Sequence, residues 1–365
     1  MLLAVALGAY PLRVSRNMRD FEVWWTAADR AAAAQPLYRT EDGHYQFKYL
    51  PAFAVLAMPI GVVPLAVAKP LWFFISVALI VALIAFSIRL LPEQRRPTWV
   101  LAVIAVLIMG KFYARELDLG QVNLAFAVAA TGAFVAMKAR REMLAAALLV
   151  LTIAIKPYGV LLLPGLVVRR QMPTAVAAAI GVWLLLLLPV PLYGLAGTID
   201  LHWGWWQTVT QSTPPNLLSP DNVSIASMYG KWLGLGTLSV TLATATSFAL
   251  LGAAAIVFLR RRTVSWPEGL EGSLLLLLIP LLSPQGWDYV LLMATPAVIY
   301  LANYQDLLPA PLRALTVVAA LTIGFSIWDL MGRAAYSAFM AAAVLSVCAL
   351  VLVGAVASLR LRAVA

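Results

Sequence analysis

Long apolar stretches, separated by short polar connections, run through almost the whole chain. A helix needs about 20 residues to cross roughly 30 Å of hydrocarbon. Nine stretches are predicted to be membrane helices: 70–91, 98–113, 121–138, 173–193, 237–259, 270–283, 288–302, 312–330 and 335–358. Because backbone in lipid must satisfy its own hydrogen bonds, the pattern predicts an all-α, polytopic integral membrane protein.

Three further apolar stretches are less regular. Residues 1–11 are short for a full span and lack the basic start and cleavage site of a signal peptide, so we expect a tilted or trimmed first helix. Residues 49–68 contain three prolines and form either a short crossing or a re-entrant piece. Residues 142–168 are interrupted by Lys156 and Pro157. Since proline cannot continue the hydrogen-bond ladder, we expect a hairpin with Lys156 at its apex.

Composition narrows the class of protein. The chain is 63% hydrophobic and 12% charged, and soluble domains carry about 25% charged residues. So few charges cannot cover a soluble particle, which excludes a cytosolic enzyme, a secreted disulfide scaffold and a disordered tail. The single cysteine, Cys348, excludes disulfides within the chain. No metal-ligand cluster is visible, so neither a metal nor a cofactor is predicted.

The net charge of +10 comes from basic residues that cluster between apolar spans. Such clusters face the cytoplasm in membrane proteins, so they do not indicate nucleic-acid binding. The clusters are Arg89/Arg95/Arg96, Lys138/Arg140/Arg141, Arg169/Arg170, Arg260/Arg261/Arg262 and Arg360/Arg362. This orientation predicts one integral domain over residues 1–365, with segments 12–48, 114–120, 194–236 and 284–288 on the outer side. Trp203, Trp205 and Trp206 lie in the third of these segments.

The first two outer segments carry candidate chemistry. Asp20 follows the first apolar stretch at the membrane surface, where it is either a helix N-cap or a catalytic base, and a capping carboxylate is also an oriented one. Gly120, Gln121, Val122 and Asn123 begin a helix. The two amides can bind hydroxyls, and the helix N-terminus favours anions. The alternative is a polar turn that only caps the span.

Charged and polar residues at three other places extend the set. Lys156 lies in an apolar run, where an ammonium is costly; it is suited to a phosphate, or it snorkels to the interface. Asn222 and Ser224 begin a helix after a proline-rich loop, where capping alone would explain Asp221 or Asn222. Asp288 enters a span after a turn that contains Trp287, and again suggests either capping or function.

Other kinds of site are missing from the sequence. It contains no Walker A loop and no Ser/His/Asp pattern. The cytoplasmic connections are too short to hold a nucleotide-binding domain, so a soluble sugar nucleotide is not expected as a donor. Any chemistry is therefore predicted on the outer face, with a lipid-borne substrate.

Several of these motifs resemble, in their order, glycosyltransferase family 87. The motifs are Asp20-Phe-Glu-Val-Trp-Trp-Thr-Ala-Ala28, Pro36-Leu-Tyr38, Phe47-Lys-Tyr-Leu-Pro51, Gly120-Gln-Val-Asn123, Lys156-Pro157, Asn222-Val-Ser224 and Ser283-Pro-x-x-Trp287. The resemblance implies a GT-C fold with about 10–13 transmembrane or re-entrant helices, similar to the polyprenyl-phosphate-mannose-dependent α-mannosyltransferases of actinobacteria. Two features depart from the family pattern. Leu50-Pro51 stands where many members have two prolines, and Asp288-Tyr289 stands where many have a histidine, which leaves the donor open.

The resemblance also implies a reaction. A sugar, mannose or a pentose, passes with inversion from a polyprenyl phosphate to a hydroxyl of a glycan, glycolipid or other acceptor. Asp20 is then the general base. Lys156, Gln121, Asn123, Asn222, Ser224 and Asp288 would bind donor phosphate or sugar, and Trp24, Trp25, Trp287 and Tyr49 would stack on sugar or lipid. The enzyme would be a multi-pass protein of the bacterial inner membrane, surrounded by lipid, with its site on the extracytoplasmic side.

Two other classes of function are compatible with an apolar chain of this kind. A transporter or flippase of a lipid-linked or small polar substrate is the main alternative, because transporters contain interrupted helices in corresponding halves. Here a single Lys-Pro break stands out, and the polar residues gather on the outer side rather than at the midplane. A non-catalytic membrane scaffold is the third possibility.

Overall fold

The computed structural model describes residue 8 and residues 14–168, 170–260 and 266–362. The predicted first helix over residues 1–11 therefore lies outside the described residues, apart from Gly8. Throughout the described ranges the chain forms helices and no β-strand, with a single isolated β-bridge between Asn222 and Trp287. The all-α class predicted from the sequence is confirmed. By their contacts, the residues of the chain group into two compact units. The sequence predicted one integral domain over residues 1–365.

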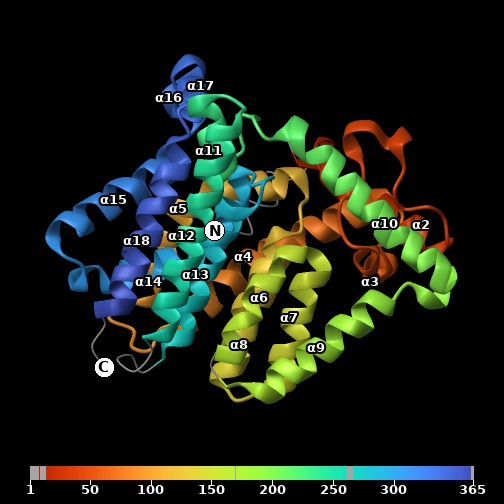
Figure 1. The fold of residues 1–365 in the computed structure, drawn as a ribbon, viewed down its shortest axis with the longest axis horizontal. Coiled ribbons are helices and arrows are strands. Elements are labelled where there is room, and N and C mark those ends of the chain that lie inside the picture. Colours follow the sequence, from red (N-terminus) through yellow and green to blue (C-terminus); the bar gives the residue numbers. More distant parts are fainter. Residues whose placement is uncertain (1–7, 9–13, 169, 261–265, 363–365) are drawn as a thin grey trace. The chain divides into compact units, whose positions relative to one another are not determined.

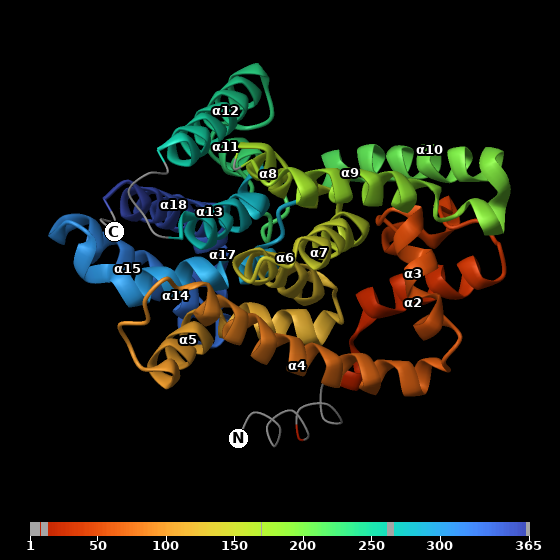
Figure 2. The same ribbon diagram turned by 90° about the horizontal axis from the view of Figure 1, so that it is seen from below.

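The first unit comprises Met1–Ala82 and Ala114–Pro214. Its helices are η1 (Val14–Arg16), α2 (Arg19–Ala32), η2 (Thr40–Tyr45), α3 (Pro51–Gly61), the first part of α4 (Leu65–Leu90), the end of α5 (Thr98–Leu119), α6 (Asn123–Lys138), α7 (Glu142–Ile155), η3 (Pro157–Leu162), α8 (Pro164–Val168), α9 (Met172–Leu187) and most of α10 (Val190–Asn216). Figures 1 and 2 show α7 packed beside α6 and α9.

The second unit comprises Leu83–Tyr113 and Pro215–Ala365. It contains the remaining parts of α4 and α5, then α11 (Ile225–Leu233), α12 (Thr237–Leu259), α13 (Pro267–Leu282), η5 (Asp288–Ala294), α14 (Thr295–Tyr304), η6 (Gln305–Leu307), α15 (Ala310–Phe325), α16 (Trp328–Met331), α17 (Arg333–Ala341) and α18 (Val344–Arg362). Within this unit α18 packs against α13, α14 and α15.

The apolar pattern located most of these helices. In the described part of the chain α4, α12 and α18 are each long and apolar enough to cross a membrane, and α9 with α10 forms a further apolar pair, bent by 87°. The predicted span 335–358 is divided, because α17 ends at Ala341 and Ala343 has φ +53° before α18 begins. Residues 114–119, predicted to be an outer connection, are instead the last turns of α5.

The two ambiguous stretches are resolved locally. Residues 51–61 form α3, whose 11 residues span about 17 Å, too little to cross the hydrocarbon as a straight helix. The predicted break after α7 is present: Lys156 has extended backbone (φ −148°, ψ 128°) and Pro157 begins the short helix η3. Gly159 packs directly on Thr152, so the chain turns back there. A hairpin with Lys156 at its bend is therefore observed.

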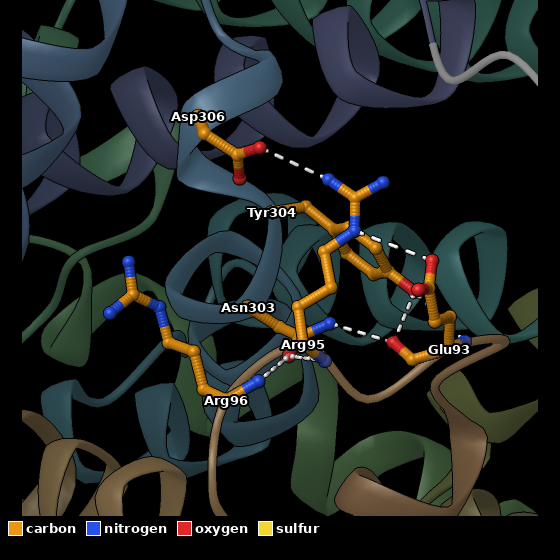
Figure 3. A network of polar contacts seen from close by, with 6 residues as sticks. All are labelled: Glu93, Arg95, Arg96, Asn303, Tyr304 and Asp306. Carbon is orange, nitrogen blue, oxygen red and sulfur yellow. Dashed lines mark hydrogen bonds and ion pairs between the residues drawn. The ribbon is translucent and has the colours of Figure 1, made fainter.

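The connection between α4 and α5 is fixed by a polar network in the second unit (Figure 3). The side-chain oxygen of Asn303 accepts hydrogen bonds from the backbone N–H groups of Arg95 (2.9 Å) and Arg96 (3.1 Å), and its amide donates to the Glu93 carbonyl. The Arg95 guanidinium pairs with Asp306 at 3.0 Å. This basic cluster is thus partly neutralised within the protein.

A second basic residue has an unexpected place. Arg360 belongs to a basic cluster predicted to face the cytoplasm. Its side chain is fully buried in the second unit, and its Nε lies 3.0 Å from Glu271 Oε1. It also donates to the Arg260 carbonyl at 2.9 Å. The sequence pattern does not show this pairing, because it cannot tell that a carboxylate on α13 meets the end of α18.

Candidate functional site

The three-residue turn between α5 and α6, together with Asn123 at the start of α6, is the centre of the site. Gly120 has φ +67°, and a Cβ there would lie 2.6 Å from the Cβ of Phe21. Only glycine avoids both the backbone strain and the clash. The Gly120 carbonyl accepts from the Trp24 indole (3.1 Å) and the Gln121 carbonyl from the Trp72 indole (3.2 Å). Buried aromatic residues of α2 and α4 therefore fix the backbone of this turn.

The first polar side chain of the turn orients the predicted base. Gln121 donates from Nε2 to Asp20 Oδ2 at 2.7 Å, and the Tyr49 hydroxyl donates to Gln121 Oε1 at 3.0 Å. Asp20 is the second residue of α2, whose N-cap is Met18, so the N-cap interpretation of Asp20 was wrong. A carboxylate in the first helical turn is nevertheless favoured by the helix dipole.

The electrostatic surroundings of the same carboxylate include a lysine. Lys48, just before Tyr49, lies within electrostatic range of Asp20. Burial lowers the pKa of Lys48, and the negative charge of Asp20 opposes that shift. The end of the first predicted outer loop thus brings a cation and a phenol to the Asp20–Gln121 pair.

The second polar side chain of the turn leads to Lys156. The Lys156 ammonium donates to Asn123 Oδ1 at 2.6 Å, and Asn123 in turn donates from Nδ2 to Glu116 Oε2 at 2.8 Å. The other oxygen of Glu116 accepts the backbone N–H of Leu124 at 3.0 Å. Glu116 and Asn123 are fully buried. The structure thus holds the lysine through a buried carboxylate and an amide.

Glu116 was missed by the sequence reasoning because residues 114–120 were interpreted as an outer connection. The available signal was a carboxylate directly after an apolar stretch, one helical turn before Gly120. A charge in such a position is costly and therefore suggests a function. Since α5 continues to Leu119, this carboxylate is carried into the protein rather than to its surface.

Two aromatic rings flank the lysine. Its ammonium nitrogen lies 5.8 Å from the ring centroid of Tyr49 and 5.8 Å from that of Tyr158, within range of a cation–π attraction. The Tyr158 hydroxyl is buried and has no hydrogen-bond partner among the described residues. Burying an unpaired hydroxyl costs free energy, so this group is available to a bound ligand.

One of the two tryptophans of α2, Trp24, differs from its prediction. Trp24 is 1% exposed and packs edge-on against Phe21 and Trp72, with centroid distances of 4.6 and 4.9 Å. It has no face left for a sugar, so its role is packing. Trp25 is half-buried, and its indole donates to the Val63 carbonyl at 3.0 Å.

The second unit gathers the remaining predicted residues at one loop pair. Asn222 donates from Nδ2 to the Pro284 carbonyl at 2.8 Å, and its side-chain oxygen accepts the Ser224 N–H at 3.0 Å. Ser224 caps α11 through the N–H of Ser227. Asp288 donates its backbone N–H to the Asp221 carbonyl at 2.8 Å, next to half-buried Trp287. Asn222 and Ser224 therefore carry structural hydrogen bonds.

A polar cavity of about 540 Å³ lies along another side of α2. Arg16, Asn17, Arg19, Glu22, Val23, Thr26, Arg30, Asp42 and Tyr45 line it. Arg30 and Asp42 pair through two hydrogen bonds of 2.6 and 2.9 Å, which hold the pKa of Asp42 below its usual value. None of the predicted site residues lines this cavity.

Apolar helices, with a buried Glu–Asn–Lys chain and an oriented aspartate in one unit, define an integral membrane protein with a polar site. The family model of glycosyltransferase family 87 matches residues 47–284, well over half of the chain. The chain therefore belongs to glycosyltransferase family 87 and is a membrane glycosyltransferase. The matched segment contains Tyr49, Gln121, Asn123 and Lys156 but begins after Asp20. A search of curated proteins finds no match.

Proposed function

We propose that the protein transfers a sugar, mannose in the first instance, from a polyprenyl phosphate to an acceptor hydroxyl with inversion at the anomeric carbon, within a GT-C fold. The observation that carries the proposal is the turn at Gly120. Its Gln121 holds Asp20, while its Asn123 holds Lys156. A base and a cation for a phosphate are therefore anchored to the same short piece of backbone.

Asp20 acts as the general base. It removes the proton of the acceptor hydroxyl as that oxygen attacks the anomeric carbon from the side opposite the phosphate. Gln121 donates to one carboxylate oxygen, which fixes the plane of the carboxylate before substrate binds. Lys48 and the N-terminal end of α2 place positive charge near this carboxylate.

Lys156 assists the departure of the leaving group. The bond between the anomeric carbon and the phosphate oxygen breaks, and the polyprenyl phosphate leaves with both electrons. An ammonium beside that oxygen offsets the growing negative charge. The buried Tyr158 hydroxyl next to Lys156 supplies a second donor to the same phosphate. Phosphate is already a good leaving group, so no general acid is required.

The other predicted residues receive narrower roles. Tyr49 and Trp25 are the half-buried aromatic side chains of the first unit that we assign to contact with sugar or lipid. Asn222 and Ser224 are assigned to holding their loop, while Trp287 and Asp288 stay predictions as ligand contacts. The basic clusters support an extracytoplasmic site in a bacterial inner membrane, with a glycan, glycolipid or other hydroxyl compound as acceptor.

The test is transfer of labelled mannose from polyprenyl-phosphate-mannose to lipid acceptors by the purified protein in nanodiscs. Loss of a general base lowers rates by roughly 10²- to 10⁴-fold, so Asp20→Asn should lose activity by that factor without a change in thermal unfolding. Asp29→Asn is the matched control, because Asp29 is an exposed carboxylate of the same helix. Full activity of Asp20→Asn would refute the base assignment. Transfer from a pentose donor but not from the mannose donor would refute the choice of sugar.

A further inference from the structure

The helix pair α9 and α10 has an arrangement that the catalytic proposal does not use. The two helices are bent by 87° relative to each other across a short break. Figure 1 shows α10 leaving the end of α9 in a different direction. Helix α9 has 16 residues, about 24 Å. On one side it exposes Val176, Ile180, Trp183, Leu184 and Leu187. These residues recur at helical spacing, as expected of a helix that crosses lipid with one face outward.

Helix α10 presents two different exposed stripes. Leu195, Ile199, Trp203 and Trp206 are between 52% and 61% exposed and follow one another at spacings of 4, 4 and 3 residues. We call them the apolar stripe. Asp200, Gln207 and Gln211, at spacings of 7 and 4, form a second exposed row beside it, the polar stripe. With 3.6 residues per turn, each set falls on one side of the helix.

The third side of α10 docks on the first unit. Thr198 and Leu201 are buried, and Trp205 donates from its indole to the Lys48 carbonyl at 3.2 Å. Gly204 lies against the ring of Tyr38, where an added Cβ would be 3.2 Å from that ring. The docking side therefore uses neither of the exposed stripes.

These three sides fit one environment. An apolar row beside a polar row is typical of a helix that lies in a membrane surface, with tryptophan at headgroup depth. The near-right-angle bend between α9 and α10 would turn the chain from a crossing helix into the surface plane. We propose that α10 is an interfacial helix, with its apolar stripe in the headgroup and upper acyl region of the bilayer and its polar stripe in water.

This placement has a consequence for the neighbouring loop. Tyr38 donates from its hydroxyl to the Tyr49 carbonyl at 2.6 Å. The Trp205 indole donates to the carbonyl of Lys48, the residue before Tyr49. An α10 anchored in the interface thus holds the Tyr49 segment at the depth of lipid headgroups. The anchoring itself does not depend on the proposed reaction; only its use in presenting a lipid phosphate does.

Depth-dependent fluorescence quenching tests the placement. Cys348 is the single cysteine of the chain, so Cys348→Ala provides a background without thiols. Ile199→Cys reports on the apolar stripe and Gln207→Cys on the polar stripe, each labelled with an environment-sensitive fluorophore in phosphatidylcholine nanodiscs. Leu195→Cys and Gln211→Cys form a second pair, should one variant of the first pair fail to fold.

Position 199 should be quenched several-fold more strongly than position 207 by a nitroxide at the top of the acyl chain. Aqueous iodide should give the opposite order. Equal iodide quenching at both positions would overturn the proposal, and so would strongest quenching of both by a nitroxide deep in the chain, the result for a crossing helix. Protection of position 199 from both quenchers would show that protein covers the stripe, which also overturns it. No outcome depends on sugar transfer.

Discussion

The chain of hydrogen bonds from Glu116 through Asn123 to Lys156 predicts how activity responds when the carboxylate of Glu116 and the amide of Asn123 are exchanged. Glu116 uses both of its oxygens as acceptors, one for Asn123 and one for the Leu124 N–H. Glu116→Gln leaves one acceptor and adds a donor. The backbone N–H of Leu124 cannot move, so the new amide group must face Asn123. Asn123 then turns its oxygen toward that amide and its NH₂ group toward the Lys156 ammonium.

The size of the effect follows from the lost bond. The contact of Lys156 with Asn123 is 2.6 Å long, and a hydrogen bond to a charged group contributes about 1.5–3 kcal/mol. At about 1.4 kcal/mol per tenfold change, a lysine that loses this anchor should lower kcat/KM for the donor by roughly 10- to 100-fold. Asn123→Asp should fail for another reason, because two buried carboxylates would meet where a donor and an acceptor are now 2.8 Å apart.

The double variant separates this reasoning from a general intolerance of the site. With Glu116→Gln and Asn123→Asp together, the new amide donates to the new carboxylate and accepts from Leu124, while the carboxylate accepts from Lys156. The three hydrogen bonds described above and the net charge are restored, so most of the activity should return. Glu142→Gln, at an exposed glutamate that begins α7, is the matched control.

Donor kinetics in nanodiscs, with thermal unfolding in parallel, decide the matter. The two single variants should be weak and the double variant should recover to within about tenfold of the parent, since coupling energies in such networks reach about 3 kcal/mol. Losses that simply add in the double variant would refute the hydrogen-bond chain. Unchanged donor kinetics in Glu116→Gln would refute the role of Glu116 in holding Lys156.

Two further predictions concern ion pairs away from the turn. Arg30 lowers the pKa of Asp42, so the pair stabilises the loop above the unfolded pKa of about 3.9 and is lost as pH falls through the lower folded value. The rate of amide hydrogen exchange of residues 40–45, corrected for the intrinsic rate, should therefore stay constant from pH 8 to about 5. Asp42→Asn should raise this rate at every pH. A loss of protection already at pH 6 would contradict the pairing. Arg360→Met should destabilise the protein by about 3–5 kcal/mol, because it breaks the buried ion pair with Glu271, and adding Glu271→Leu should recover most of that loss. Equal melting temperatures of the single and double variants would contradict the attribution of the loss to the buried Glu271 carboxylate.

The helices could be predicted from the sequence where lipid imposes a strict requirement. An apolar run as long as 237–259 has few alternatives to a continuous helix, and α12 has those bounds. The end of α5 and the break before α18 could not be predicted in the same way. Arg115, Glu116 and Asp118 look like a polar connection, but the helix continues because the Glu116 carboxylate is satisfied by groups that come later in the chain.

The sequence predicted which residues belong to the candidate site better than it predicted which of them form hydrogen bonds with each other. The polar residues of the turn, the aspartate and the lysine were all recognised as costly or unusual in an apolar chain, and the first unit brings them into contact. Sequence spacing cannot say that Gln121 belongs to Asp20 and Asn123 to Lys156, because a turn of unknown shape can aim each amide either way. Trp24 was misinterpreted for a similar reason, since its type suggests stacking and its buried position decides otherwise.

The turn explains how a weakly polar chain can hold two opposite charges in fixed positions. Its backbone is set by packing, because Gly120 has no room for a side chain and two buried indoles hold the carbonyls of Gly120 and Gln121. Gln121 and Asn123 are two residues apart on that rigid backbone, so the groups that they hold cannot drift independently. Positioning the proposed base and the cation by one short segment avoids the entropy of ordering two separate loops at each turnover. In a membrane enzyme with few polar residues, apolar packing thus does the positioning that hydrogen-bonded loops do in soluble transferases.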